Sequence, residues 1–561
     1  MSSFLQDWPL QAVLLVALCL SLTWHNLISG NVPNPYLDEF FHVPQAQKYC
    51  EGDYTWDPKI TTPPGLYLVA KFANPVFGCS TASLRALNVL ASVLLCLSSY
   101  DILRLLRIRN VKSRDVPVDG RQSYNKKDTS DSTAVPDANT ALNIALFPPL
   151  FFFSALFYTD VWSTLMVLLS YNVFLRKKTA YGSPFEIISA VVVGLVALLF
   201  RQTNIFWVAV FPAGLEVINT LKAEASLGKT SHATNIVEAV QRGWKYGVVQ
   251  DCAVQEAAFQ DYAILLLTVA IAVIRKPLSI IRTTLPYLML LALFASFVIW
   301  NGSVVLGDKS AHTATIHLPQ MLYIWPYITF FSAPLVAGPL LQAASRHLPL
   351  QIRTSMEKIH LAYGTYGLPD AALSGIFILV AVGAVHWNTI IHPYTLADNR
   401  HYVFYVFRIF RQHPAIKYLA IPVYYTCAWL VTNAIGVQSN DQPALKEQRK
   451  NGHPTSAETR YLPCQVSFLT IWLVTTTLSV VTAPLVEPRY FILPWIIWRL
   501  NVQTAPASLS RQRPSNGNRY DVRLGLETLW LLAINITIAH TFLYRGFTWP
   551  DEPGKVQRFL W

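Results

Sequence analysis

The chain has 561 residues, of which 53% are hydrophobic, 13% are aromatic and only 14% are charged, with a formal net charge of +12. This composition excludes an ordinary soluble domain and a nucleic-acid-binding protein of the usual highly charged kind, and it predicts a polytopic membrane protein. The seven cysteines show neither CxxC spacing nor a zinc pattern, so they define no metal site.

The predicted elements are almost all helices that cross the bilayer. Leu10–Ile28 is long enough to span about 30 Å of hydrocarbon, and no Lys or Arg precedes it as in a signal peptide. We expect an all-α protein with about 13 transmembrane helices in one domain, 1–561. The apolar runs are Leu10–Ile28, Leu84–Leu106, Ala141–Phe157, Val161–Leu175, Phe185–Phe200, Ile205–Leu221, Leu285–Leu306, Met321–Leu341, Ala371–Ile391, Tyr418–Val437, Cys464–Val486, Tyr490–Leu500 and Leu526–Tyr544.

Two shorter apolar stretches, Leu66–Cys79 and Ala263–Ile274, are predicted to lie at the membrane interface because neither reaches spanning length. With the N-terminus in the cytosol, most of the 44 Lys and Arg residues fall in cytosolic loops, as the positive-inside rule requires. The segments 107–139, 222–262 and 438–462 are then cytosolic connectors. The same topology puts every polar motif on the opposite, lumenal face.

The first lumenal loop, 30–83, is the most informative of these segments. It holds the sequence YLDEFFHVPQAQKYCEGDYTWDPKITTPPGLY, in which acids, amides, a histidine and aromatic residues crowd together beside an apolar helix. A membrane anchor has no need of such groups. A protein that collects them at the bilayer edge is expected to act on a polar group attached to a lipid.

Several motifs of the chain resemble those of a known family. They are DEFFHVPQAQKYCEG, WDPKITTPPGLY, GDKSAH followed by HLPQ, LADNRHYVFY, EPRYFILPW and the terminal QRFLW, and they run in order from residue 36 to 561. They are similar to the dolichyl-phosphate-glucose-dependent α-1,2-glucosyltransferases of the endoplasmic reticulum, which add the last glucose to the lipid-linked N-glycan precursor. The resemblance implies a C-type glycosyltransferase fold, a lumenal active site in a multi-pass membrane protein, a polyprenyl phosphosugar donor, a dolichyl-diphosphate-linked acceptor, and no metal or other cofactor.

Glucosyl transfer with inversion needs one base for the proton of the acceptor hydroxyl. Asp38 and Glu39 are the candidates, and as neighbours they point about 100° apart on a helix, so they cannot form the facing carboxylate pair of a glycosidase. In related enzymes the first acid of this loop acts as the base. We therefore assign the base to Asp38 and an orienting or reserve role to Glu39; the alternative is that the pair caps an interfacial helix.

Other residues of the loop are candidate substrate ligands. His42 and Gln45 follow the two acids, and Trp56 is able to stack on a sugar ring. Asp57 either orients the acceptor hydroxyl or fixes the turn before the prolines, and the sequence does not separate these roles. Cys50 and Cys79 share the oxidising side, but their distance, and hence their pairing, is left open.

The donor phosphate and the acceptor diphosphate require cations near the lumenal surface, where arginine offers a two-pronged contact. Arg400 and His401 rank first, ahead of Lys309 and Arg489; the alternative for each is a side chain that merely extends to the interface. His312 and His317 complete the set. They lie five apart rather than four and have no third ligand nearby, so a metal site is not expected.

Two other functions compete with this one. A transporter or channel would place charges in mid-membrane and show repeated halves, neither of which the sequence contains. A related transferase that uses dolichyl phosphate mannose would differ mainly in its donor and acceptor pockets, which motif spacing does not resolve. The sequence gives no information on the oligomeric state.

Overall fold

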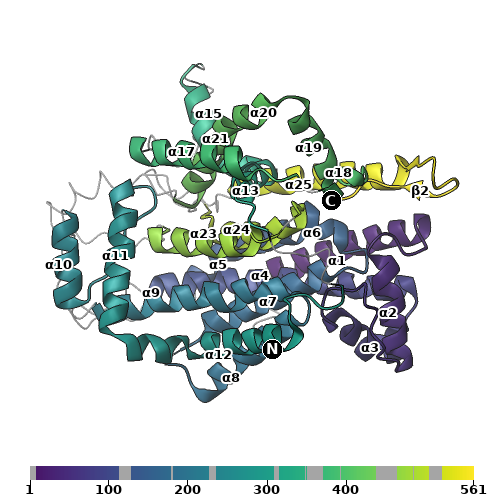
Figure 1. Cartoon of the computed structure of the whole chain (residues 1–561), viewed down its shortest axis with the longest axis horizontal. Coiled ribbons are helices and arrows are strands. Elements are labelled where there is room, and N and C mark those ends of the chain that lie inside the picture. The colour runs from purple at the N-terminus through teal and green to yellow at the C-terminus, as the bar shows by residue number, and fades with distance from the viewer. Residues whose placement is uncertain are drawn as a thin grey trace.

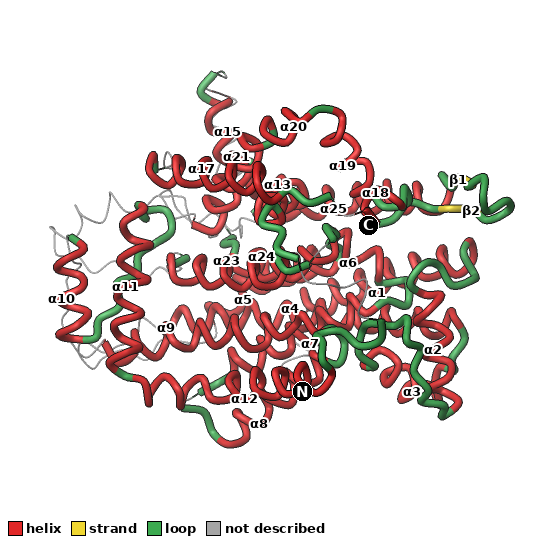
Figure 2. The backbone as a smooth tube through the Cα atoms, viewed as in Figure 1, coloured by secondary structure: helices red, strands yellow, loops and turns green. Residues whose placement is uncertain are grey.

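The computed structural model describes residues 8–112, 128–178, 181–225, 235–308, 315–347, 349, 351, 370–391, 393–436, 464–483, 485–504 and 521–561. Helices dominate these residues, and the strands in them form one two-stranded antiparallel pair, β1–β2 (Figure 2). The predicted all-α architecture is therefore confirmed for the described part of the chain.

Several helices of the first half of the chain begin and end close to the predicted runs, whereas α5 begins well before the run 141–157 and α12 begins well before the run 285–306. Tyr158 precedes α7 in extended conformation, and Asp160 in the first turn and Arg176 in the last have charges that suit the helix dipole. Ser183 and Glu186 form a capping box at the start of α8. The elements are α1 (Trp8–Asn31), α2 (Glu39–Glu51), α3 (Gly65–Phe77), α4 (Thr81–Lys112), α5 (Asp128–Ala145), α6 (Pro148–Phe153), α7 (Thr159–Arg176), α8 (Pro184–Leu198), η2 (Gln202–Asn204), η3 (Phe206–Val210), α9 (Phe211–Ala225), α10 (Ile236–Tyr246), α11 (Phe259–Arg275) and α12 (Pro277–Asn301).

The second half contains more short helices. Proline and glycine interrupt several of its apolar runs, since proline lacks the amide hydrogen that a helix interior needs. The elements are α13 (Gln320–Phe331), α14 (Ala333–Val336), α15 (Gly338–Ser345), α17 (Ala371–Asn388), α18 (Pro393–Ala397), α19 (Tyr402–Gln412), α20 (Pro414–Leu419), α21 (Ile421–Gly436), α23 (Val466–Val480), η4 (Pro488–Phe491), α24 (Ile492–Asn501), α25 (Val522–Tyr544), β1 (Phe547–Thr548) and β2 (Val556–Gln557).

Seven helical segments of the described residues are long and apolar enough to cross a membrane. They are Trp8–Asn31, Thr81–Arg109, Gln202–Glu224, Pro277–Asn301, Ala371–Asn388, Pro414–Gly436 and Val522–Tyr544. The protein is thus a multi-pass membrane protein, but the count of 13 spans is not confirmed. Two predicted spans are broken: 141–157 divides at Pro148 into the end of α5 and α6, and 321–341 divides into α13, α14 and α15.

The core lies where α4 packs against α1, α5 and α7, and where α7 packs against α8. Most side chains of α7 are buried, so this helix is surrounded by others. Trp495 of α24 is fully buried and stacks on Phe147, with ring centroids 3.8 Å apart.

The two ends of this bundle differ (Figure 1). One end carries α2, α3, α18 and the β1–β2 pair, and the other carries α10 and α11, whose axes run across the direction of α4, α7 and α9. The orientation of α11 fits the interfacial placement predicted for 263–274.

The connector predicted at 222–262 contains the helix α10, which the sequence did not predict. Asn235 accepts a hydrogen bond from the backbone N–H of Glu238, and Gly247 ends the helix in the left-handed conformation. Ala239 and Gly243 are buried on the side that packs against α11. Of the connector at 107–139, residues through Lys112 belong to α4 and those from Asp128 belong to α5, and 438–462 lies outside the described residues.

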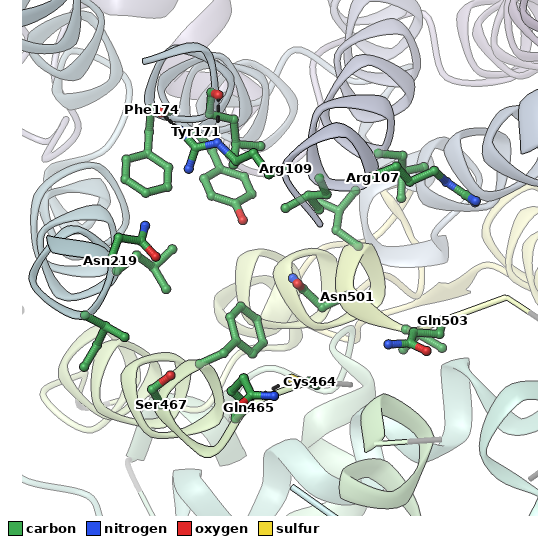
Figure 3. Close-up of a pocket in the computed structure, with 18 of the residues that line it drawn as sticks. Arg107, Arg109, Tyr171, Phe174, Asn219, Cys464, Gln465, Ser467, Asn501 and Gln503 are labelled. Atoms are coloured by element: carbon green, nitrogen blue, oxygen red, sulfur yellow. Dashed lines mark hydrogen bonds between the residues drawn. The ribbon is translucent and has the colours of Figure 1, made fainter. Parts of the chain in front are cut away.

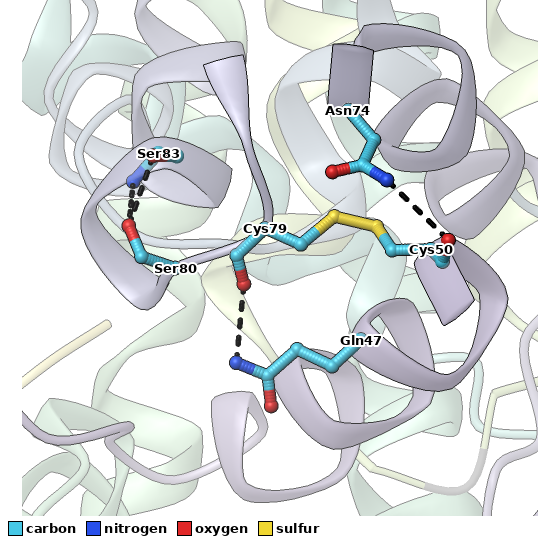
Figure 4. The surroundings of a disulfide bond; sticks show 6 residues. All are labelled: Gln47, Cys50, Asn74, Cys79, Ser80 and Ser83. Atoms are coloured by element: carbon cyan, nitrogen blue, oxygen red, sulfur yellow. Dashed lines mark hydrogen bonds between the residues drawn. A yellow bond between two sulfur atoms is a disulfide. The ribbon is translucent and has the colours of Figure 1, made fainter.

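A disulfide fixes the first loop. Cys50 near the end of α2 is bonded to Cys79, which lies between α3 and α4 (Figure 4). Asn74 donates a hydrogen bond to the carbonyl of Cys50, and Gln47 donates one to the carbonyl of Cys79. The pairing that the sequence left open is therefore present, and it ties both helices of the loop to the start of α4.

Candidate active site

Asp38 stands at the start of α2 with its carboxylate open to solvent. The residue before it, Leu37, has a φ of 51°, which is rare outside glycine and is one form of local strain that clusters at functional sites. The Asp38 side chain makes no capping hydrogen bond to α2, so the capping alternative does not describe it. Its side chain is 45% exposed.

The partner of Asp38 is Arg489, which lies 451 residues away in the sequence. Nη1 of Arg489 donates to Oδ2 of Asp38 at 3.1 Å. On its other side, Nε and Nη2 of Arg489 contact Oε2 of Glu487 at 3.1 and 2.8 Å. The guanidinium also lies against the rings of Phe153 and Tyr158, with centroids 5.5 and 5.8 Å away.

Asp160 completes this group of charges from the first turn of α7. Its Oδ1 accepts a hydrogen bond from Arg201 at 3.0 Å, and its Oδ2 lies 3.7 Å from Nη1 of Arg489. The Asp160 side chain is fully buried. Together Asp38, Asp160, Glu487, Arg489 and Arg201 form the ionic cluster, a name used below for these five residues.

The cluster sets the protonation states of its members. Burial alone would raise the pKa of Asp38, but the charge of Arg489 and its hydrogen bond lower it below its usual range. Burial lowers the pKa of His42 despite the nearby charge of Asp38, so this ring is neutral at pH 7. Burial works against the charge of Arg489, yet Glu487, Asp38 and Asp160 together raise its pKa, so it stays protonated.

Glu39 does not fit the catalytic or orienting role predicted for it. Its side chain is fully buried and forms an ion pair with Arg85 of α4, with Nη2–Oε2 and Nε–Oε1 distances of 2.6 and 2.9 Å. Its Oε2 also accepts from the backbone N–H of Tyr36, and its Oε1 from that of Phe157. Both oxygens are thus occupied by the protein itself, which leaves none for a substrate.

The other predicted ligands of this loop make contacts that hold the loop together. His42 contacts the hydroxyl of Tyr67 at 2.7 Å. Gln45 donates to the carbonyl of Thr55 and accepts from the N–H of Asp57. The Asp57 carboxylate accepts from the N–H of Lys59, and the indole of Trp56 donates to the carbonyl of Ile60. The turn-fixing role of Asp57 is the one that these contacts favour.

The GDK motif docks on the same loop. The N–H of Asp308 donates to the carbonyl of Pro58 at 2.7 Å, and the N–H of Leu306 donates to that of Thr61. Gly307 has a φ of +63°, and a Cβ there would lie 2.3 Å from the Pro58 oxygen and 2.5 Å from that of Ile60. Only glycine permits this approach. Lys309 and His312 lie outside the described residues.

Arg400 and His401 are joined to the end of the chain. Arg400 pairs with Asp398 at 2.7 Å, donates to Gln557 and lies over the ring of Trp549. His401 pairs in a parallel bridge with Leu560, and its Nδ1 lies 3.1 Å from the backbone oxygen of Trp561. The guanidinium of Arg400 is therefore already bound within the protein, whereas His401 is close enough to affect the pKa of Asp38.

His317 is placed differently from the other predicted ligands. Its side chain is fully buried just before α13, and neither ring nitrogen has a hydrogen-bond partner among the residues that the structure describes. Burial lowers its pKa to about 4. Among the residues that the structure describes, no three His, Cys, Asp or Glu side chains gather as metal ligands would.

Sequence reasoning missed Asp160 and Glu487. Both belong to motifs that stand out in the sequence, YTD at 158–160 and EPRY at 487–490, but neither motif shows which charges it will meet. Arg489 pairs with an acid of a different motif, Asp38, whereas Arg400 pairs with Asp398 of its own motif. Pairing acids and arginines between motifs would therefore have ranked Arg489 above Arg400.

A cavity of about 530 Å³ lies at the opposite ends of α4, α7 and α24. Figure 3 shows its polar lining, which includes Arg107, Arg109 and Asn501. Its cations are held internally: Arg107 pairs with Asp137, Lys222 pairs with Asp251, and Arg109 donates to carbonyls at the end of α7. The ionic cluster is therefore the better candidate for the active site.

Comparison with known proteins gives the family. The model of the DIE2/ALG10 family matches residues 32–500, which include the whole ionic cluster. This chain belongs to the DIE2/ALG10 family. The family resemblance read from the sequence motifs is thereby confirmed.

Curated relatives match almost the whole chain. A protein of Aspergillus fumigatus named Dol-P-Glc:Glc(2)Man(9)GlcNAc(2)-PP-Dol alpha-1,2-glucosyltransferase is 39% identical, over 98% of this chain and 97% of its own length. A human protein of the same name is 30% identical, over 99% of both chains. Among solved structures, the archaeal oligosaccharyltransferase AglB from Archaeoglobus fulgidus covers 88% of this chain and 56% of its own, with 13% identity and a TM-score of 0.28. That likeness is too weak to establish a shared fold.

Proposed function

We propose that this protein transfers glucose from dolichyl phosphate glucose to the diglucosylated, dolichyl-diphosphate-linked oligosaccharide, forming the terminal α-1,2-linked glucose with inversion at the anomeric carbon. The observation that carries the proposal is the family membership, with relatives of that activity aligned over nearly the full chain. The ionic cluster supplies the kinds of group that this chemistry needs.

In this reaction Asp38 is the general base. The acceptor hydroxyl attacks the anomeric carbon while its proton passes to the Asp38 carboxylate, and the bond from that carbon to the donor phosphate oxygen breaks. The electron pair leaves with dolichyl phosphate, whose growing charge needs a fixed cation. Arg489 is the cation that pairs with Asp38, and it binds the phosphate in this proposal.

The remaining predicted ligands take supporting roles. His401 lies near Asp38 and is able to contact a sugar hydroxyl or the phosphate, while Gln45, Trp56 and Asp57 shape the wall of the loop. Glu39 is a structural residue that fixes the start of α2 through Arg85. Lys309 and His312 stay candidates for the acceptor diphosphate. The reaction is proposed to need no cofactor.

We place the ionic cluster on the lumenal face of the endoplasmic reticulum membrane, with a cytosolic N-terminus and a C-type glycosyltransferase fold of about 13 helices. The disulfide Cys50–Cys79, which joins the end of α2 to the segment before α4, supports this placement, because disulfides form in the oxidising lumen and are rare in the cytosol. The positive-inside pattern of the loops supports the same orientation.

Reconstitution tests the proposal. The purified protein in liposomes receives dolichyl phosphate glucose and the diglucosylated acceptor, and Asp38→Asn is compared with Asp53→Asn, an exposed acid of the same loop that only binds Thr55. We expect Asp38→Asn to lose activity by at least about a hundredfold and Asp53→Asn to keep it. If dolichyl phosphate mannose is the only donor used, the protein is instead the related mannose-dependent transferase. If Asp38→Asn stays active, the base is another residue.

A further inference from the structure

One nitrogen of Arg489 faces two carboxylates. Nη1 lies 3.1 Å from Oδ2 of Asp38 and 3.7 Å from Oδ2 of Asp160. The Asp160 oxygen is buried and has no hydrogen-bond partner in the described part of the chain, whereas the other oxygen of that carboxylate accepts a hydrogen bond from Arg201. A buried carboxylate oxygen without a hydrogen-bond donor lowers the stability of the folded state, which indicates that its position beside Arg489 has a function.

The ion pair between Asp38 and Arg489 is incompatible with the roles that the proposed reaction gives to these two residues. A carboxylate that is bound to an arginine is a weaker base, because the ion pair stabilises its ionised form. The same pair also occupies the Nη1 group that the donor phosphate would use. Asp38 and Arg489 can thus perform their proposed roles only after they separate.

We propose that the Asp38–Arg489 pair is a latch that the donor phosphate opens, and that Asp160 is the positioning residue that receives Arg489 when it leaves Asp38. This inference rests on the proposed function. It implies an order of events: the donor must bind before Asp38 becomes free to accept the acceptor proton.

The geometry makes the exchange small. A shift of Nη1 by less than about 1 Å brings it within hydrogen-bond distance of the Asp160 oxygen. Glu487 keeps hold of Nε and Nη2, so the guanidinium pivots and does not leave the site. Once Arg489 has turned to the phosphate and Asp160, Asp38 keeps its position at the start of α2 and loses the cation that pairs with it.

The strength of the latch is modest, which suits a contact that a substrate must break. The Asp38 side chain is 45% exposed, so solvent screens the pair and its contribution is close to that of a surface ion pair, while Asp160 and Arg489 are buried. A phosphate diester that approaches Arg489 competes with a carboxylate of equal charge and can displace it.

Donor binding tests the latch apart from catalysis. The dissociation constant of dolichyl phosphate glucose is measured for the purified protein in detergent, without acceptor, for the wild type and for Asp38→Asn, Asp160→Asn and Arg489→Gln. We expect Asp38→Asn to bind the donor about two- to fivefold more tightly, because the competing carboxylate is gone. Asp160→Asn should bind it no more tightly than the wild type does, and Arg489→Gln should bind it more weakly.

The comparison between the two aspartates is the control. If lower negative charge were the whole cause, both Asn variants would tighten binding alike, and that result overturns the latch. An unchanged dissociation constant in Asp38→Asn overturns it as well. If Asp160→Asn does not fold, the double variant Asp38→Asn/Arg489→Gln tests the latch instead. The latch predicts that the double variant binds dolichyl phosphate glucose no more tightly than Arg489→Gln alone, and tighter binding would overturn it. A wild type that binds no dolichyl phosphate glucose at all would instead refute the proposed function.

Discussion

The two adjacent acids of the first loop should differ sharply when each is replaced by its amide. Asp38→Asn removes a half-exposed carboxylate whose partner, Arg489, keeps Glu487 and Asp160 as counter-charges. Glu39→Gln instead removes the charge of a fully buried pair. We expect the first change to abolish transfer with little loss of stability, and the second to destabilise the fold.

The magnitude for Glu39→Gln follows from its four hydrogen bonds. Each carboxylate oxygen accepts from one nitrogen of Arg85 and from one backbone N–H, of Phe157 for Oε1 and of Tyr36 for Oε2. Whichever way the amide is turned, its NH₂ group faces two donors. Arg85 keeps the carbonyls of Val32 and Asn34 but loses the carboxylate with which it pairs. Breaking one side of such a buried pair costs about 3–5 kcal/mol.

Thermal unfolding in detergent measures the difference. A loss of about 3–5 kcal/mol should lower the apparent Tm of Glu39→Gln by about 3–4 °C, because the unfolding entropy of a chain of 561 residues is large, whereas Asp38→Asn should stay within about 1 °C of the wild type. The assignment of the two acids would be refuted by two results together: Glu39→Gln unfolds at the same temperature as the wild type, and Asp38→Asn retains glucosyl transfer.

Three further predictions concern stability and the shape of the loop. Gly307→Ala should lower both Tm and activity because its Cβ meets the Pro58 carbonyl, while Gly554→Ala, which has a similar φ but open space around it, should cost only the backbone strain of about 1 kcal/mol. Reduction of the Cys50–Cys79 disulfide, which closes a loop with a sequence separation of 29, should cost about 3–4 kcal/mol of stability. Dithiothreitol should therefore lower the Tm of the wild type and leave that of Cys50→Ser/Cys79→Ser unchanged. If the Tm of the wild type does not respond to the reductant, the disulfide is contradicted. Burial lowers the pKa of His317 from 6.5 to about 4, so as the pH falls the imidazole binds a proton in the unfolded chain before it does so in the folded one. The folded state therefore loses stability as the pH falls from 6.5 to about 4, by about 3 kcal/mol in full. His317→Phe should flatten the pH dependence of Tm in that range, and an unaltered slope would contradict the lowered pKa.

The sequence located the loop that carries Asp38 but not the role of each acid in it. Asp38 and Glu39 are chemically alike, and a helix start accommodates either. Their roles separate only because Glu39 meets Arg85, 46 residues away, while Asp38 meets Arg489. The sequence also did not show that Arg400, ranked first among the cations, is bound by Asp398, two residues earlier, and by Gln557.

What the sequence determined by itself is the class of protein, its helical and membrane-bound nature, and the motifs that mark its family. Those properties depend on local features, namely apolar runs of spanning length and short strings of unusual residues. The tertiary structure decided which charges meet. The ionic cluster joins residues from the first loop, the start of α7, the end of α8 and the segment before α24, and the stability of each buried charge depends on partners that the chain brings together only on folding.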